Sequence, residues 1–237
     1  MTKIEIVERL MKFHLSRQEA QLYICLKENG NLTGYEASKI SGISRSNVYA
    51  ALNTLVEKGA ALASEGTTLI YTAVDPKEFL DNKMKELMED REYIIHWFPE
   101  KEKEIKGYFT IQGSTNIKNK IFHMIKSCEM RMYFSAEADI LKDFEDLILK
   151  TKQEGKKVVL MSNSDYSPIS TKFYRDEPGK GQIRLITDSA YVLTGELTGN
   201  NTDTCLYSEQ ENLVTIMKDA LGNKIKLLEL EGTERKE

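Results

Sequence analysis

The amino-acid sequence predicts an α+β protein of more than one domain: a helical N-terminal module completed by a β-hairpin, a linker helix, and a C-terminal α/β module. Three observations support this prediction. Short amphipathic segments separated by glycine turns come first, a charged helix with a regular apolar stripe follows, and strand-like and helix-like segments then alternate. With 237 residues, the chain is long enough for more than one domain. We expect the boundaries to give residues 1–75, 76–105 and 106–237.

The N-terminal helices are predicted from their start signals and apolar spacing. Ser16 and Glu19 form a capping box that opens a helix expected to end near Glu28, and Thr33 and Glu36 open a short second helix. After a glycine turn, Ser44 is expected to cap a third helix. Its inward stripe is predicted to consist of Val48, Leu52, Leu55 and Val56.

A β-hairpin is predicted directly after these helices. Residues 61–64 and 68–73 are strand-like and flank a turn at residues 65–67. Three short helices followed by a hairpin indicate a winged helix-turn-helix. The outer face of the third helix carries hydroxyls, amides, a phenol and a guanidinium, which suit base edges and phosphates of a double-stranded DNA operator. The predicted DNA-binding residues are Lys39, Ser44, Arg45, Ser46, Asn47, Tyr49, Asn53, Thr67 and Thr68.

Charge does not by itself favour nucleic acid. The formal net charge is −4, and phosphate neutralisation by Lys and Arg supplies most non-specific DNA affinity. DNA binding must therefore be argued from the local residues of the N-terminal module. The alternative is a winged-helix adaptor that binds another protein, but such a face would more often be apolar.

The linker helix is predicted to begin at Pro76 and to end near Pro99. Apolar residues recur along it with a spacing of alternately four and three, which is typical of a coiled-coil seam. A homodimer is favoured over a helix that packs on its own domain, because a single helix-turn-helix makes too few operator contacts. The predicted dimerisation residues are Leu80, Met84, Leu87, Arg91, Ile94 and Phe98.

The C-terminal module is predicted to be an α/β sheet with a ligand site. Strands are expected at residues 108–111, 130–134, 157–161, 183–186, 190–193 and 204–207, helices at 114–127, 140–154 and 211–221, and a loop-rich insertion at 162–182. Ligands of open α/β sheets bind beyond the carboxyl ends of the strands. The predicted effector-binding residues are Ser135, Glu137, Ser162, Asn163, Asp165, Asp188 and Tyr191, although each of them, taken alone, is more often a turn or cap residue than a ligand contact.

Composition excludes several other classes. Neither a signal peptide nor the roughly 20 apolar residues of a membrane span is recognisable, so we expect a soluble, cytoplasmic protein without a membrane partner. Cys25, Cys128 and Cys205 are odd in number and far apart, which predicts reduced thiols. The three histidines are also isolated. We predict no metal site and no cofactor.

Four segments of the N-terminal module resemble the TrmB family of transcription regulators. They are LSRQEAQLY (residues 15–23), TGYEASKISGISRSNVY (33–49), LNTLVEKG (52–59) and YTAVDP (71–76). The resemblance implies a DNA-binding regulator whose DNA affinity responds to a small-molecule effector, a sugar in some members. Wings of this family usually carry Lys or Arg near the tip, and residues 65–68 here carry none. We therefore expect modest, salt-sensitive binding that depends on Lys39, Arg45 and Lys58.

The order of the C-terminal elements resembles the phospholipase-D-like regulatory domain of TrmB relatives. Catalytic members of that fold carry the pattern H-x-K-x-x-x-x-D. With Asp188 in the acidic place, the His and Lys places fall on Gly181 and Ile183, which have no acid, base or phosphate-binding side chain. The resemblance therefore implies a non-catalytic sensing domain and no enzyme, with a phosphodiesterase as the less favoured alternative.

Overall fold

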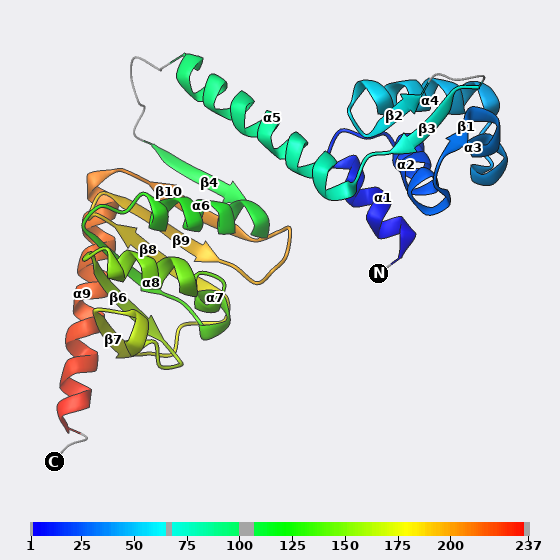
Figure 1. The fold of residues 1–237 in the computed structure, drawn as a ribbon. Coiled ribbons are helices and arrows are strands. Elements are labelled where there is room, and N and C mark those ends of the chain that lie inside the picture. Colours follow the sequence, from blue (N-terminus) through cyan, green and yellow to red (C-terminus); the bar gives the residue numbers. More distant parts are fainter. Residues whose placement is uncertain (1, 65–67, 100–106, 235–237) are drawn as a thin grey trace. The chain divides into compact units, whose positions relative to one another are not determined.

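The computed structural model describes residues 2–64, 68–99 and 107–234. The chain forms two compact units, Met1–Lys101 and Glu102–Glu237, and each has its own hydrophobic core (Figure 1). The linker helix belongs to the first unit. Among the described helices, none combines the length and the apolarity needed to cross a membrane.

The first unit has four short helices, a small antiparallel sheet and the linker helix. The helices are α1 (Lys3–Met11), α2 (Arg17–Asn29), α3 (Gly34–Ser41), α4 (Arg45–Glu57) and α5 (Pro76–Trp97). The strands β1 (Leu32–Thr33), β2 (Ala61–Ser64) and β3 (Ile70–Ala73) form a sheet in the order β1-β3-β2. This arrangement is the predicted winged helix-turn-helix, with α1 as an additional helix. The predicted turn at residues 65–67 lies outside the described residues.

The beginning of α5 is anchored to the first unit by its aromatic residues. The Phe79 side chain is 1% exposed and its ring centroid lies 5.6 Å from that of Tyr23 on α2. The Tyr23 hydroxyl donates a hydrogen bond of 2.9 Å to the carbonyl oxygen of Val74, just before the helix. Leu80 is half-buried against the same core. These contacts fix the direction of α5 relative to α2 at the start of the helix.

The second unit is a seven-stranded mixed sheet covered by helices on both faces. Its strands are β4 (Tyr108–Gln112), β5 (Arg131–Ser135), β6 (Lys157–Ser162), β7 (Lys172–Arg175), β8 (Gln182–Thr187), β9 (Tyr191–Glu196) and β10 (Thr204–Ser208), in the order β4-β10-β9-β8-β5-β6-β7. Only the β5–β6 and β6–β7 pairs are parallel. The remaining neighbours, including β5 and β8, are antiparallel.

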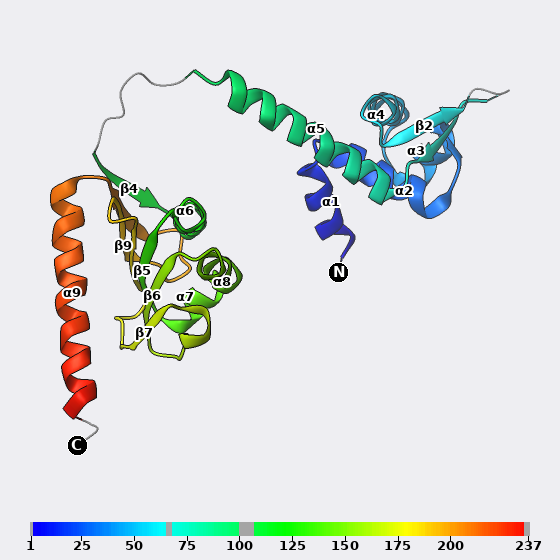
Figure 2. The same cartoon turned by 60° about the vertical axis from the view of Figure 1, so that its left-hand side comes forward.

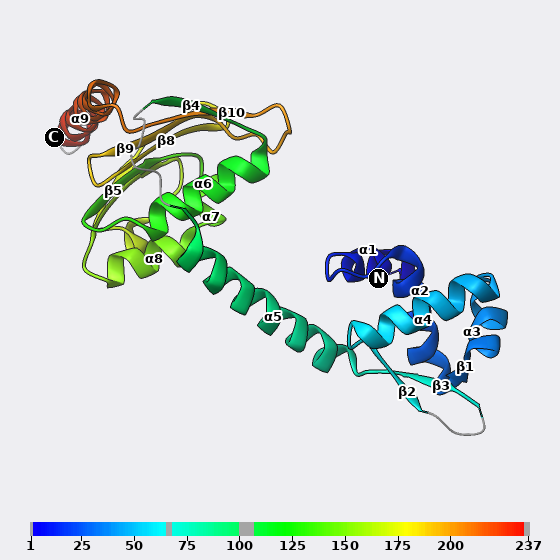
Figure 3. The ribbon, with the colours of Figure 1, turned by 90° about the horizontal axis from the view of Figure 1, so that it is seen from above.

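The helices divide between the two faces of this sheet. Helices α6 (Ser114–Lys126) and α8 (Glu145–Gln153) pack with the larger core, whereas α9 (Glu211–Glu234) covers the opposite face. Figure 2, in which the sheet is seen nearly edge-on, and Figure 3 show the sheet between these two layers. The inner face of α9 packs through Val214, Leu221 and neighbouring apolar residues.

Three predicted elements of the second unit differ from the structure. The helix expected over residues 140–154 is two helices, α7 (Ala138–Lys142) and α8, because the backbone of Phe144 leaves the helical conformation while its ring enters the core. The insertion expected to be loop-rich contains β7 and a 3-10 turn, Ser167–Ile169. The final helix extends to Glu234, well beyond the predicted end at residue 221.

Candidate functional site

Helix α4 turns an apolar face inward and a polar face outward. Val48, Leu52 and Leu55 are fully buried in the core of the first unit. Burial of this stripe forces the remaining positions of the helix toward the surface. The predicted DNA-binding residues that the structure describes are all exposed: Lys39, Ser44, Arg45, Ser46, Asn47, Tyr49, Asn53 and Thr68. Thr67 lies outside the described residues.

The N-terminus of α4 is open, unlike those of α1, α2 and α3. Each of these three helices starts with a capping box in which a glutamate accepts a backbone hydrogen bond. Helix α4 has no acidic residue in its first turn, and the predicted side-chain cap by Ser44 is wrong, because its hydroxyl lies 3.4 Å from that of Ser46 instead. The first amides of α4 and the positive end of its dipole are therefore available to a phosphate.

Arg45 is held between α3 and α4 by an aromatic ring. Its guanidinium carbon lies 4.5 Å from the ring centroid of Tyr35, which is 51% exposed. Such a cation–π contact orients the guanidinium while leaving its donors exposed. Tyr35 was not among the predicted site residues. Its place in the first turn of α3 is the sequence signal that could have indicated it. Ile40, also on α3, is likewise 51% exposed.

Two further residues of the outer face are positioned by contacts beneath them. The Tyr49 ring covers Gly34, where an added Cβ would lie only 2.3 Å from Tyr49 Cε1. The Tyr71 hydroxyl donates a hydrogen bond of 3.2 Å to Asn53 Oδ1, and burial raises the pKa of Tyr71, so the hydroxyl stays protonated. This bond engages the Asn53 amide oxygen, so the amide nitrogen is the group of this exposed side chain that can donate to a base or a phosphate.

Lys58 is already engaged inside the first unit. Its ammonium lies 2.6 Å from Glu19 Oε2 and donates a 2.7 Å hydrogen bond to the carbonyl oxygen of His14. This pair ties the end of α4 to the start of α2. The expectation that Lys58 contributes a phosphate contact is therefore not supported by its position. Lys39 and Arg45 remain as the exposed cations beside the outer face of α4.

The predicted effector-binding residues do not converge on one site. One group follows β5 and β6 at the carboxyl edge of the parallel strands: Ser135, Glu137, Ser162, Asn163 and Asp165. The other group, Asp188 and Tyr191, lies in or beside the β8–β9 turn. Because β8 runs antiparallel to β5, with Thr187 beside Met132, this turn is at the opposite edge of the sheet. Only a β8 parallel to β5 would have placed Asp188 at the same edge as Glu137.

The polar atoms at the carboxyl edge mainly hold loops together. Glu137 Oε2 accepts a 2.6 Å hydrogen bond from the Gly181 amide, and Asn163 Oδ1 accepts one of 2.9 Å from Ala138. Asp165 Oδ1 accepts a 2.8 Å bond from the Ser167 amide, which lowers the pKa of Asp165. Ser162 is fully buried. These contacts are those of turn and cap residues.

The places that a phospholipase-D-type pattern would occupy carry no reactive side chain. Ile183 is fully buried. Gly181 has φ +68°, and an added Cβ there would lie 2.7 Å from Thr198 Cγ2. Within the described residues, no group of three or more His, Cys, Asp or Glu side chains is placed to hold a metal ion. Burial raises the pKa of the Cys128 thiol to about 11 and that of Cys205 to about 12, so these thiols stay protonated.

Asp188 fixes the β8–β9 turn to the start of β5. Its carboxylate accepts hydrogen bonds from the amides of Glu129, Met130 and Arg131, at 2.9, 2.7 and 3.0 Å. Burial raises the pKa of Asp188, but these bonds outweigh it and hold the pKa below its usual value. Asp188 and Ser189 both have positive φ, so the turn depends on this anchoring.

We expect Asp188→Asn to destabilise the second unit by about 1 to 3 kcal/mol, because one carboxylate oxygen and the charge behind these bonds are lost. Native-state hydrogen exchange of β5 and β8 amides measures this for the second unit alone. The pKa of Asp188 is depressed in the folded state. The contribution of its carboxylate to stability is therefore fully present above the unfolded pKa of about 3.9, and it is lost as the pH falls through the folded pKa. Asp165→Asn is the control, because the Asp165 carboxylate accepts one backbone hydrogen bond, from Ser167. Equal hydrogen-exchange protection in the two variants would contradict the role of Asp188.

Comparison with known proteins gives matches for both units. Residues 10–77 match the family described as "Sugar-specific transcriptional regulator TrmB". YrhO of Bacillus subtilis (strain 168) is 26% identical over 240 residues, covering 96% of this chain and 87% of that protein. TrmBL1 of Pyrococcus furiosus, described as an HTH-type sugar sensing transcriptional regulator, is 25% identical over 174 residues, or 71% of this chain and 50% of that relative.

Two solved structures align with this chain at low sequence identity. TrmBL2, described as an archaeal chromatin protein with a novel mode of DNA binding, gives a TM-score of 0.45 at 19% identity, covering 95% of this chain and 99% of its own. Nuc of Salmonella typhimurium, described as a phospholipase D family member, gives a TM-score of 0.39 at 15% identity, covering 51% of this chain and 95% of its own.

Proposed function

We propose that this chain, whose residues 10–77 are a TrmB-family module, is a transcription regulator that binds double-stranded DNA through α4. The family match confirms the resemblance on which the sequence analysis relied. The observation that carries the proposal is the outer face of α4, which is polar, exposed and open at its N-terminus. A face made to bind protein would not require these polar groups.

The geometry supports a recognition helix that enters the major groove. Recognition helices contact base edges mainly through their N-terminal residues, and Arg45, Ser46 and Asn47 form the first turn of α4. Arg45 can donate two hydrogen bonds to guanine, and the open amides can bind a neighbouring phosphate. Thr68, exposed beside the hairpin turn, would approach the backbone without adding charge.

We expect Arg45→Ala to weaken operator binding by about 1 to 3 kcal/mol, because the guanidinium is the strongest hydrogen-bond donor of the outer face. Fluorescence anisotropy with labelled operator DNA at several salt concentrations measures the change. A base contact predicts relaxed specificity at one base pair, whereas a phosphate contact predicts a uniform loss and a smaller salt slope.

Matched variants separate this contact from general charge. Arg9→Ala removes the same charge from α1, and should leave the affinity nearly unchanged. Asn53→Ala should weaken binding without altering the salt slope, because it removes a neutral donor. If Arg45→Ala stays folded and binds as tightly as the wild type, α4 is not the recognition helix.

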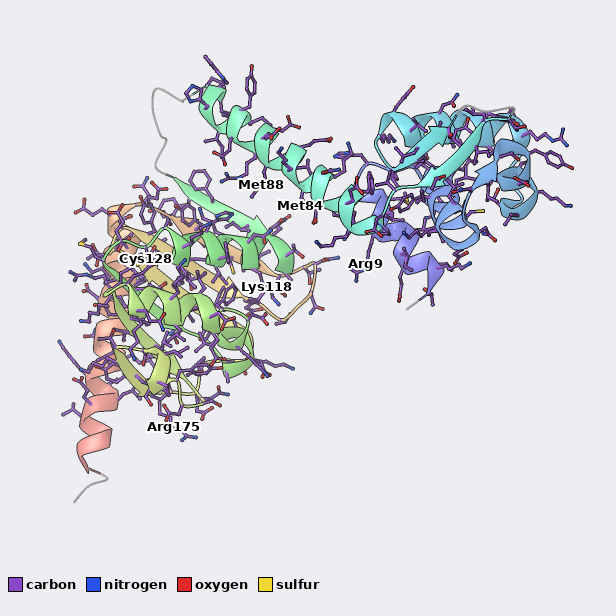
Figure 4. The ribbon with its side chains drawn as sticks, in the orientation of Figure 1. Arg9, Met84, Met88, Lys118, Cys128 and Arg175 are labelled. Atoms are coloured by element: carbon purple, nitrogen blue, oxygen red, sulfur yellow. The ribbon has the colours of Figure 1, made fainter. Side chains whose placement is uncertain are left out.

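We further propose that the protein acts as a homodimer joined through α5. Past its anchored first turns, the helix exposes the apolar residues Met84, Leu87, Met88, Ile94, Ile95 and Phe98. Phe98 is 69% exposed, and Met84 and Met88 are labelled in Figure 4. Exposed apolar side chains at this spacing are suited to pairing with the same helix of a second copy. Leu80 packs on its own core, so the proposed seam begins at Met84.

The second unit is proposed to be a non-catalytic sensor that changes DNA affinity in a cytoplasmic regulator. In support, the Gly181 and Ile183 positions supply no nucleophile, acid or base. The printed description of TrmBL1 as sugar sensing makes a sugar one candidate effector here. Coupling of effector and DNA must be reciprocal, so operator DNA should change effector affinity by the same factor as the effector changes DNA affinity.

A further inference from the structure

A pocket lies between α9 and the sheet of the second unit, near the edge where β5 and β6 begin. Its volume is 400 Å³, within the range of small-molecule sites. Its lining includes the buried apolar side chains Val159, Ile186 and Leu221, and the rings of Tyr133 and Tyr174. The remaining lining residues are mostly cationic: Arg131, Lys157, Lys172, Lys218 and Lys226.

The strand register explains how these cations come together. Alternate residues of a strand face the same side, and Tyr133, Val159 and Tyr174 face α9. A basic residue lies two positions before each of them: Arg131, Lys157 and Lys172. Arg131 pairs with Lys157, and Lys172 pairs with Val159, two residues after Lys157. The three cations therefore lie on one face of neighbouring parallel strands, with Arg131 beside Lys157 and Lys172 offset by two residues.

The positive charge of this pocket is compensated only in part. Glu229 is the one acidic residue among those that line it. Its Oε1 lies 2.7 Å from the Lys172 ammonium and accepts a 2.7 Å hydrogen bond from the Tyr174 hydroxyl. Among the side chains that the structure describes, residues 2–64, 68–99 and 107–230, no ion pair joins Arg131, Lys157, Lys218 or Lys226 to a carboxylate. In a chain of net charge −4, such a concentration of cations is a local feature with a strong positive field.

The pocket is also held in shape by the Asp188 anchor. Asp188 binds the backbone amide of Arg131, and the next residue, Ser189, is part of the pocket lining. The anchor therefore fixes two sides of the pocket entrance relative to each other.

We propose that this pocket binds a phosphorylated small molecule, with the phosphate beside Arg131 and Lys157 and the organic part against Tyr133, Tyr174 and the apolar floor. Phosphate matches several cations and the planar donors of arginine, whereas an uncharged sugar would leave the cations uncompensated. The concave shape and apolar floor favour a small organic molecule over duplex DNA. Ligand binding in this pocket does not depend on the proposed DNA binding. Only the role of the pocket as an effector site rests on that proposal.

The test uses the full-length protein and isothermal titration with glucose 6-phosphate, AMP, inorganic phosphate and glucose. We expect at least one of the two organic phosphates to bind more tightly than inorganic phosphate, and glucose not to bind. Arg131→Ala and Lys157→Ala should each weaken that binding by about 10- to 100-fold, the effect of removing a hydrogen bond to a charged group. The control Lys150→Ala, on α8 at the other face of the sheet, should bind like the wild type.

Several results would overturn the proposal. The first is that neither organic phosphate binds, and the second is that glucose binds more tightly than the organic phosphates. The others are that organic and inorganic phosphate bind equally, or that Arg131→Ala, Lys157→Ala and Lys150→Ala all bind with the same affinity. A loss of DNA affinity in Lys157→Ala without any phosphate-compound binding would instead make the pocket a second DNA contact. Arg45→Ala should retain ligand binding, so failure of the DNA-binding proposal and failure of the pocket are measured separately.

Discussion

Leu87→Asp is expected to convert the proposed α5 dimer into a monomer and to weaken operator binding by about 100-fold or more. Leu87 lies in the middle of the exposed apolar seam of α5. In a paired seam, two carboxylates would face each other in an apolar environment and lose hydration. A dimer binds two half-sites at once, and loss of this second binding event removes an avidity of about 10²- to 10⁴-fold. Sedimentation measures the mass, and anisotropy the affinity.

Asn82→Asp is the matched control for this substitution. It adds the same charge to α5 at an exposed position outside the seam, and should leave both mass and affinity unchanged. If Leu87→Asp still sediments as a dimer, the interface lies elsewhere. The outer face of α9, where Ile216, Leu227 and Leu230 are exposed, would then be the next candidate.

Gly195→Ala is expected to destabilise the second unit by more than about 3 kcal/mol, at the high end for single substitutions. Gly195 lies in β9 with φ +156° and pairs with Cys205 of β10. An added Cβ would lie 2.3 Å from the carbonyl oxygen of Thr204 and 2.7 Å from the Cys205 Cα. Both are backbone atoms of a paired strand, so relief requires separation of the two strands.

Hydrogen exchange distinguishes this effect from a general loss of stability. Gly195→Ala should reduce the protection of β9 and β10 amides while leaving α2 and α4 unchanged, because the two units have separate cores. Gly222→Ala, in α9 with open space around the added Cβ, should be neutral or stabilising by up to about 1 kcal/mol. Unchanged protection of β9 in Gly195→Ala would show that the sheet accommodates the methyl group.

The first unit could be predicted closely because its signals are local. The capping boxes at Ser16 and Thr33 mark the starts of α2 and α3, and the stripe beginning at Val48 identifies the inner face of α4. The roles of Lys58 and Tyr35 could not be predicted, since each depends on a contact with another helix. Local spacing determines which residues a helix exposes, but not which of them find partners across the unit.

The second unit was less predictable because its ligand geometry depends on strand direction. The segments that form the strands other than β7 were identified, yet Asp188 and Glu137 were expected at one edge and lie at opposite edges. The basic pocket escaped detection for the same reason. Its cations are spread from Arg131 to Lys226, and only the β5-β6-β7 register and the full length of α9 bring them together.

Sequencing of the DNA that copurifies with the protein after crosslinking in cells tests the central claim most directly. The account predicts enrichment of a short sequence in two inverted copies whose centres lie about one helical turn, roughly 10 base pairs, apart. It also predicts that Arg45→Ala loses this enrichment, whereas Arg9→Ala retains it. No enriched sequence with the wild-type protein, or the same enrichment with Arg45→Ala, would contradict the proposal that α4 reads DNA.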